Sequence, residues 1–135
     1  MFRVFQRQPP DFNLFEAART DNVRLAQKAL ASGVKIDTLD TMGRTALCLA
    51  AKYGHFNVIQ FLAKSGANVD FAMPNGKTPI FYAINSGSTE SVKVLIKCGA
   101  NVEVKDEAGY TPYQYASARA SINMLDVLSP KSEGR

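Results

Sequence analysis

Apolar side chains recur along the chain at the spacing of short helices that bury one side. The clearest run has its apolar positions at Phe56, Val58, Ile59, Phe61 and Leu62. Residues three and four positions apart lie on the same side of a helix, so this run predicts a helix that ends at Gly66. A shorter run before it predicts a helix from Thr45 to about Tyr53, and Gly54 and His55 separate the two.

This pair of helices is repeated along the chain with a period of 33 residues. Three sets of residues keep the period independently: the turn glycines, the glycines after each second helix, and an acidic position. They are Gly43, Gly76 and Gly109; Gly33, Gly66 and Gly99; and Asp37, Asp70 and Glu103. A small residue that lets helices approach closely also recurs, at Ala17, Ala50, Ala83 and Ala116. These sets indicate a repeat array, in which stacking buries the apolar sides.

The period divides most of the chain into four units. Residues 11–37 are a degenerate first unit, residues 38–70, 71–103 and 104–128 are full units, and residues 1–10 and 129–135 are a lead-in and a polar tail. Each unit reads as turn, helix, tight loop, helix, so the predicted fold is an all-α solenoid of helix-turn-helix units with hairpin-like turns. We expect Thr78 to cap a first helix with Pro79 at its first position, and Gly66 to end a second helix in the left-handed conformation.

The repeated motifs resemble those of a known family. They are Gly43-Arg44-Thr45-Ala46-Leu47, Asn75-Gly76-Lys77-Thr78-Pro79-Ile80, Gly109-Tyr110-Thr111-Pro112 and Gly66-Ala67-Asn68-Val69-Asp70. With them, residues 11–128 resemble the ankyrin repeat family. The resemblance implies protein binding without catalysis, through the hairpin tips and the concave face of the first helices, and small members of this size are often inhibitors or adaptors. The chain departs from the family's turn histidine at Cys48, Phe81 and Gln114, and Met73 replaces a turn aspartate.

Composition narrows the class of protein without naming a partner. The chain has 135 residues, 46% of them hydrophobic and 21% charged, and a net charge of +4, as in a folded, mildly basic domain. It shows no membrane-spanning run and no signal peptide, and Cys48 and Cys98 give no disulfide framework. We therefore expect a cytoplasmic protein, monomeric alone. The polar ends argue against a module cut from a larger protein, and Phe2, Val4 and Phe5 either lie against the stack or form a docking peptide.

The sequence offers no catalytic, metal or cofactor site. The single histidine, His55, is expected to cap a second helix, and a nucleophilic pair with Cys48 is the weaker alternative because nothing orients the imidazole. The acids at Asp37, Asp70 and Glu103 fall in separate units, so we expect hydrogen bonds in the turns instead of acid–base chemistry. Two cysteines and one histidine do not make a zinc site.

The candidate partner-binding residues are those at the family's usual contact positions. They are Arg19, Met42, Arg44, Lys52, Tyr53, Asn75, Lys77, Asn85, Tyr110 and Arg119. Five of them are basic, and aromatic residues among them could serve as anchors, so we expect an acidic protein partner. An anionic ligand or nucleic acid bound on the same basic face is the alternative; nucleic acid ranks lower because no aromatic stacking platform is recognisable. An ordinary solvated surface is the third interpretation.

Overall fold

The computed structural model describes residue 9, residues 11–119 and residues 121–129. These described residues form eight helices and no strand. In chain order, the helices are α1 (Phe12–Thr20), α2 (Val23–Ala31), α3 (Ala46–Lys52), α4 (Phe56–Lys64), α5 (Pro79–Ser86), α6 (Thr89–Lys97), α7 (Pro112–Ala118) and α8 (Ile122–Leu128). They form pairs with a short link inside each pair and a long loop between pairs, which is the predicted order of elements.

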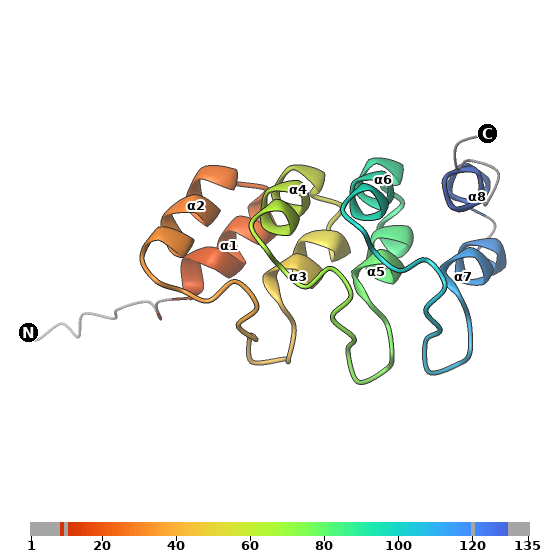
Figure 1. Ribbon diagram of the computed structural model, residues 1–135, viewed down its shortest axis with the longest axis horizontal. Coiled ribbons are helices and arrows are strands. Elements are labelled where there is room, and N and C mark those ends of the chain that lie inside the picture. The colour runs from red at the N-terminus through yellow and green to blue at the C-terminus, as the bar shows by residue number, and fades with distance from the viewer. Residues whose placement is uncertain (1–8, 10, 120, 130–135) are drawn as a thin grey trace, which may run out of the picture.

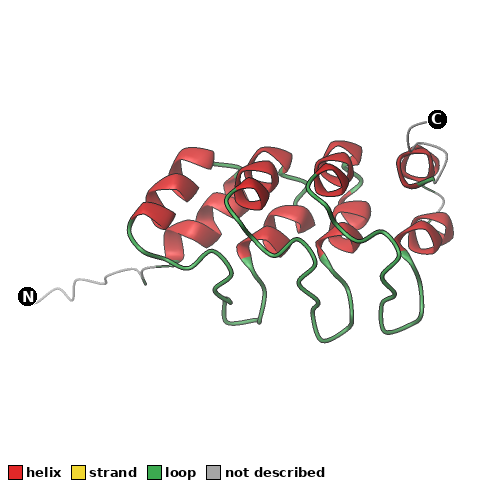
Figure 2. Ribbon diagram, in the orientation of Figure 1, coloured by secondary structure: helices red, strands yellow, loops and turns green. Residues whose placement is uncertain are grey.

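The helices are arranged in two parallel rows (Figure 1). The inner helices α1, α3, α5 and α7 stand beside the long loops, and the outer helices α2, α4, α6 and α8 cover them from the other side (Figure 2). Each helix contacts its partner in the pair and its neighbours in its own row. The fold is therefore the predicted all-α solenoid, and the three long loops (the hairpin loops, residues 32–45, 65–78 and 98–111) project along one side.

The core lies between the two rows and runs the length of the stack. Ala17, Ala50, Ala83 and Ala116 are all 0% exposed, which confirms that the recurring small residue sits where helices meet. Leu62 and Leu95, one period apart on α4 and α6, are also fully buried. No unit could bury these side chains alone, so each unit depends on its neighbours for stability.

The first helices of the last three units begin at the predicted threonines, but one of these threonines makes no side-chain cap bond. The Thr45 hydroxyl accepts a hydrogen bond from the Cys48 amide at 3.2 Å, and Thr111 forms a capping box with Gln114. Thr78 occupies the same position, but its side chain makes no cap bond, and its buried hydroxyl has no hydrogen-bond partner among the described residues. Thr78 is therefore the N-cap residue with Pro79 directly after it, as predicted, but the expected side-chain cap bond is absent. The reason is local: the Phe81 amide donates to the Thr78 carbonyl oxygen instead, at 3.0 Å.

The glycine that follows each of the first three outer helices has the expected conformation. Gly66 has a φ of +103°, and the next amide, of Ala67, donates to the Leu62 carbonyl oxygen at 3.0 Å. The bond satisfies a carbonyl that the end of α4 would otherwise leave without a partner. The chain can then turn into the hairpin loop that leads to the next unit.

Candidate functional site

The first hairpin loop is held together by one carboxylate. Asp40 Oδ1 accepts hydrogen bonds from the Met42 and Arg44 amides, both at 2.9 Å, and its Oδ2 lies 3.0 Å from Arg44 Nε. Partial burial raises the pKa of Asp40, but the Arg44 and Met42 amides and the Arg44 guanidinium together hold it below its ordinary value. The Arg44 charge is therefore partly used to stabilise its own loop.

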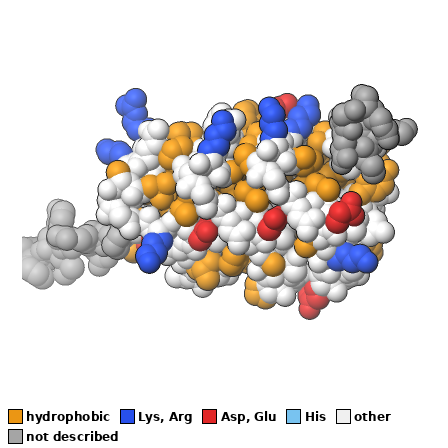
Figure 3. All heavy atoms as spheres, in the orientation of Figure 1, with side chains coloured by type: hydrophobic (Ala, Val, Ile, Leu, Met, Phe, Trp, Pro, Cys, Tyr) orange, Lys and Arg blue, Asp and Glu red, His pale blue; other side chains and the backbone are white. Residues whose placement is uncertain are grey.

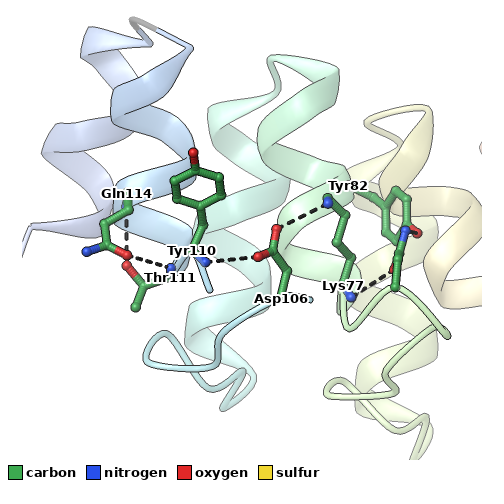
Figure 4. Close-up of polar contacts among 7 residues, drawn as sticks. Lys77, Tyr82, Asp106, Tyr110, Thr111 and Gln114 are labelled. Atoms are coloured by element: carbon green, nitrogen blue, oxygen red, sulfur yellow. Dashed lines mark hydrogen bonds and ion pairs between the residues drawn. The ribbon is translucent and has the colours of Figure 1, made fainter. Parts of the chain in front are cut away.

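The second hairpin loop keeps the same backbone path without the carboxylate. Met73 replaces the aspartate, and Asn75 Oδ1 accepts the Lys77 amide at 2.9 Å instead. Among the described residues, Lys77 forms no ion pair within its own loop, and its Nζ lies 3.1 Å from Oδ2 of Asp106 in the next loop (Figure 4). The missing turn aspartate has thus been replaced by an amide, and the lysine connects two units.

The third hairpin loop is tied closely to the second. Asp106 Oδ1 accepts the Tyr110 amide at 2.9 Å, and the Asp106 side chain is only 1% exposed. Its removal from water raises the pKa of Asp106, but the Tyr110 amide and the Lys77 ammonium hold it below its ordinary value. The Glu107 amide also donates to the Asn75 carbonyl oxygen at 2.8 Å. The second and third loops are therefore joined to each other by a backbone hydrogen bond and by the contact between Lys77 and Asp106.

The recurring acids connect neighbouring units at the base of the loops. Both oxygens of Asp37 accept from the Asn68 amide, at 3.1 and 3.2 Å, and Asp70 accepts from the Asn101 amide at 2.8 Å. These bonds confirm the predicted role in the turns for Asp37 and Asp70. Each carboxylate serves the next unit along the chain, so the two do not meet in one site.

The predicted binding residues fall into two lines and not into one cluster. The loop row comprises Met42, Arg44, Asn75, Lys77 and Tyr110, on the hairpin loops. The helix-end row comprises Arg19, Lys52, Tyr53, Asn85 and Arg119, at the C-terminal ends of the inner helices. Met42 is 69% exposed, whereas Arg44 and Lys77 are half-buried in the ion pairs described above. The loop row therefore offers apolar and neutral groups more readily than positive charge.

The helix-end row carries three cations and no carboxylate. Arg19 pairs with Glu16, one turn earlier on α1. The Lys52 ammonium lies 5.6 Å from the centre of the Tyr53 ring, and the Arg119 guanidinium lies 5.2 Å from the centre of the Tyr115 ring. Neither Lys52 nor Arg119 forms an ion pair within the described part of the chain. This row is the more available positive surface on the inner side.

Two tyrosines that the sequence reasoning did not select lie between the two rows. The Tyr115 ring meets Phe81 edge-on at 5.4 Å, and its centre is 5.3 Å from Lys77 Nζ. Tyr82 Oη accepts a hydrogen bond from Asn75 Nδ2 at 3.4 Å. Tyr82 is one period after Leu49, an inner-helix position, and Tyr115 is two periods after it, so the period itself held the signal that would have found them.

A pocket of about 410 Å³ opens between α1, α3 and the first hairpin loop. Phe12, Phe15, Leu39 and Leu49 supply its apolar walls. Phe15 and Leu49 are 9% and 2% exposed and so belong to the core, whereas Leu39 is 48% exposed. The charged side chains at its edge are Asp11, Arg19, Asp40 and Arg44. The pocket therefore has apolar walls and includes Arg19, the first residue of the helix-end row, in its lining.

The histidine and the cysteines show no catalytic arrangement. His55 stands at the N-terminal cap of α4, but its side chain makes no cap bond; its Nε2 lies 2.9 Å from the Arg19 carbonyl oxygen instead. The expected capping bond is therefore wrong, and the ring instead ties the start of α4 to the C-terminal end of α1. Cys48 is buried, and this burial raises the pKa of its thiol. Within the described residues, no three metal-ligating side chains come together.

The outer helices carry most of the excess positive charge. Their cations are Arg24, Lys28, Lys64, Lys93 and Lys97, and their acids are Glu90 and Asp126. Figure 3 shows blue side chains along the edge that the outer helices form, and a line of acidic side chains nearer the loops. The net charge of the chain therefore does not by itself place a basic patch on the inner side.

Comparison with known proteins agrees with the geometry. A family model described as ankyrin repeats (3 copies) matches residues 14–106 and 74–134. No curated protein matches the chain. Among the described helices, none is both long and apolar enough to cross a bilayer.

Proposed function

Because the chain belongs to the ankyrin repeat family, we propose that it is a small inhibitor or adaptor that binds an acidic protein partner on its inner side. Ankyrin repeats generally mediate protein–protein interaction, and the specific role is our inference. The observation that carries it is the helix-end row, in which Lys52 and Arg119 form no ion pair among the described residues and stand in line with Tyr53. An exposed row of one charge favours a partner of the opposite charge.

The internal ion pairs decide which residues meet the partner's acids. Arg44 and Lys77 already contact Asp40 and Asp106, so a partner carboxylate would have to compete with these pairs. Lys52 and Arg119 have no such competitor in the described part of the chain. We therefore assign the electrostatic contact to the helix-end row, and contact by apolar groups to Met42 and Tyr110 in the loop row.

The test is a pull-down with two matched charge reversals. The inner variant is Lys52→Glu with Arg119→Glu, and the control is Lys64→Glu with Lys97→Glu on outer helices α4 and α6. Both change the net charge equally and leave the loop ion pairs intact. A protein captured from the source cell by wild type and by the control, but lost from the inner variant, supports the proposal. Capture that survives in the inner variant refutes it.

A second candidate, a polyanionic ligand, is favoured by the charge on the outer helices. Five cations there face only two acids. Binding of a nucleic acid would weaken steeply with salt because condensed counterions are released from the phosphates. If single-stranded RNA binds with a steep salt dependence and the outer-helix control variant loses that binding, the polyanion function is supported on the outer side.

A further inference from the structure

We propose that the pocket between α1, α3 and the first hairpin loop receives one bulky apolar side chain of an extended acidic segment in the partner. The inference rests on the proposed function, because it specifies the chemistry of the same inner side. It adds a shape requirement to the charge requirement. A partner would be selected for an anchor residue as well as for its carboxylates.

The size and walls of the pocket fit an anchor of this kind. An apolar cavity of about 150 Å³ accepts benzene, so a volume of about 410 Å³ accommodates a leucine or phenylalanine side chain and part of its backbone. Phe15 and Leu49 form a floor that the core already holds in place, and Leu39 forms a wall that is 48% exposed. Because the floor is fixed before binding, the anchor loses little affinity to rearrangement of the pocket.

The charges around the pocket determine where an acidic residue of the segment is favoured. Lys52, which forms no ion pair among the described residues, follows Leu49 by one turn of α3, whereas Arg19 lines the pocket but is paired with Glu16. Of the two carboxylates that line the pocket, Asp40 is paired with Arg44, whereas Asp11 forms no ion pair among the described residues and repels an acid placed beside it. A carboxylate of the partner is therefore attracted towards the helix ends. Since an extended chain advances about 3.3 Å per residue, an acid within about three residues of the anchor reaches Lys52.

The same geometry sets the position of a second acid. Arg119 follows α7, which is two inner helices further along the stack than α3. Packed helices lie about 8–10 Å apart, so Arg119 is reached by a residue about five or six positions from the anchor. The expected segment is thus short, extended and linear, with one apolar anchor and acids on one side of it.

The experiment selects the segment without assuming its sequence. A library of random twelve-residue peptides is selected on the full chain, and the best peptides are measured by fluorescence anisotropy against wild type and variants. We expect peptides with a Leu, Ile, Met or Phe anchor and Asp or Glu at the stated spacing. Replacing the anchor by serine is expected to weaken binding at least about tenfold, because that burial is lost.

The protein variants separate this proposal from the proposed function. Leu39→Ser alters the exposed wall and spares the core, Lys52→Glu removes the nearest cation, and Lys64→Glu is the matched outer-helix control. Weaker binding to the first two variants and unchanged binding to the control support the proposal. If Lys52→Glu abolishes binding while Leu39→Ser has no effect, the inner side still binds acidic segments, and the pocket assignment is overturned.

The chain's own residues 2–5 are the other possible occupant. They include Phe2, Val4 and Phe5, and residue 9 lines the pocket. A variant with serine at these three positions is measured with the same peptides. If the peptides bind this variant but not the wild type, the pocket is assigned to the chain's own segment, and the proposal is overturned. The absence of any peptide whose binding depends on Leu39 would overturn it as well.

Discussion

Alanine at Gly76 should destabilise the protein more than alanine at Gly43, although the two glycines have nearly the same backbone conformation. Their φ values are +80° and +77°. An L-residue in this left-handed region costs about 1–2 kcal/mol, and that cost applies at both positions. The surroundings differ: a Cβ at Gly43 would meet nothing within 4 Å, whereas one at Gly76 would lie 2.8 Å from the Glu107 backbone nitrogen.

The close contact cannot be relieved by a side-chain rotation, because the atoms nearest to the added Cβ are the backbone atoms of Asp106 and Glu107. The third loop would have to move away from the second. That movement stretches the hydrogen bond from the Glu107 amide to the Asn75 carbonyl oxygen, worth about 1 kcal/mol, and weakens the contact between Lys77 and buried Asp106. We therefore expect Gly43→Ala to cost about 1–2 kcal/mol and Gly76→Ala about 2–4 kcal/mol.

Urea unfolding followed by circular dichroism measures both costs. A second measurement tests the mechanism: in a Lys77→Met background, Gly76→Ala should cost less than in wild type, because the ion pair that it weakens is already absent. Equal costs at Gly43 and Gly76, or fully additive costs with Lys77→Met, would show that the two loops are not coupled as described.

Three further predictions use the same unfolding assay or a simple chemical probe. Thr78→Val should leave stability unchanged or raise it by up to about 1 kcal/mol, since the buried hydroxyl has no partner, whereas Thr45→Val should lose about 1 kcal/mol with its cap; equal losses would contradict this. The lowered pKa of Asp106 means that its stabilisation is full above its unfolded pKa near 4 and is lost as pH falls through the folded value. The stability advantage of wild type over Asp106→Asn should therefore be present at pH 7 and shrink below about pH 4, and a constant advantage would refute the assignment. Cys48, buried with a raised pKa, should resist alkylation at pH 8 in the folded protein while Cys98 reacts, as peptide mass spectrometry can show.

The period predicted the fold because it reports on packing that is repeated. The glycines, the small residues and the apolar positions each do the same physical task in every unit, so a sequence comparison of the units exposes them. The site was harder to predict for the opposite reason. The side-chain contacts at Lys77 depend on Met73 and Asp106, which lie in different units, and no local pattern shows that the lysine reaches forward.

The sequence predicted where the candidate residues lie, but it did not predict which of them are free to contact a partner. Arg44 and Lys77 look like free surface charges in the sequence, but each is paired in its loops. Tyr82 and Tyr115 were not selected, although they recur one period apart on the inner helices. The pocket was not predicted either, because its walls come from the degenerate first unit and the first loop, which the repeat pattern describes least well.

The unequal ties between the hairpin loops divide the binding side into a stiff part and an adaptable part. The tip of the first loop satisfies Asp40 internally, so Met42 can change its position without disturbing the next unit. The tips of the second and third loops share bonds and must move together. A partner that contacts Tyr110 therefore meets two loops that are fixed to each other, whereas the tip of the first loop, held by its own Asp40 bonds, can shift independently of the second loop. Partners that differ in the residues that face Tyr110 would then be distinguished at the joined loops, while the tip of the first loop adapts to differences around Met42.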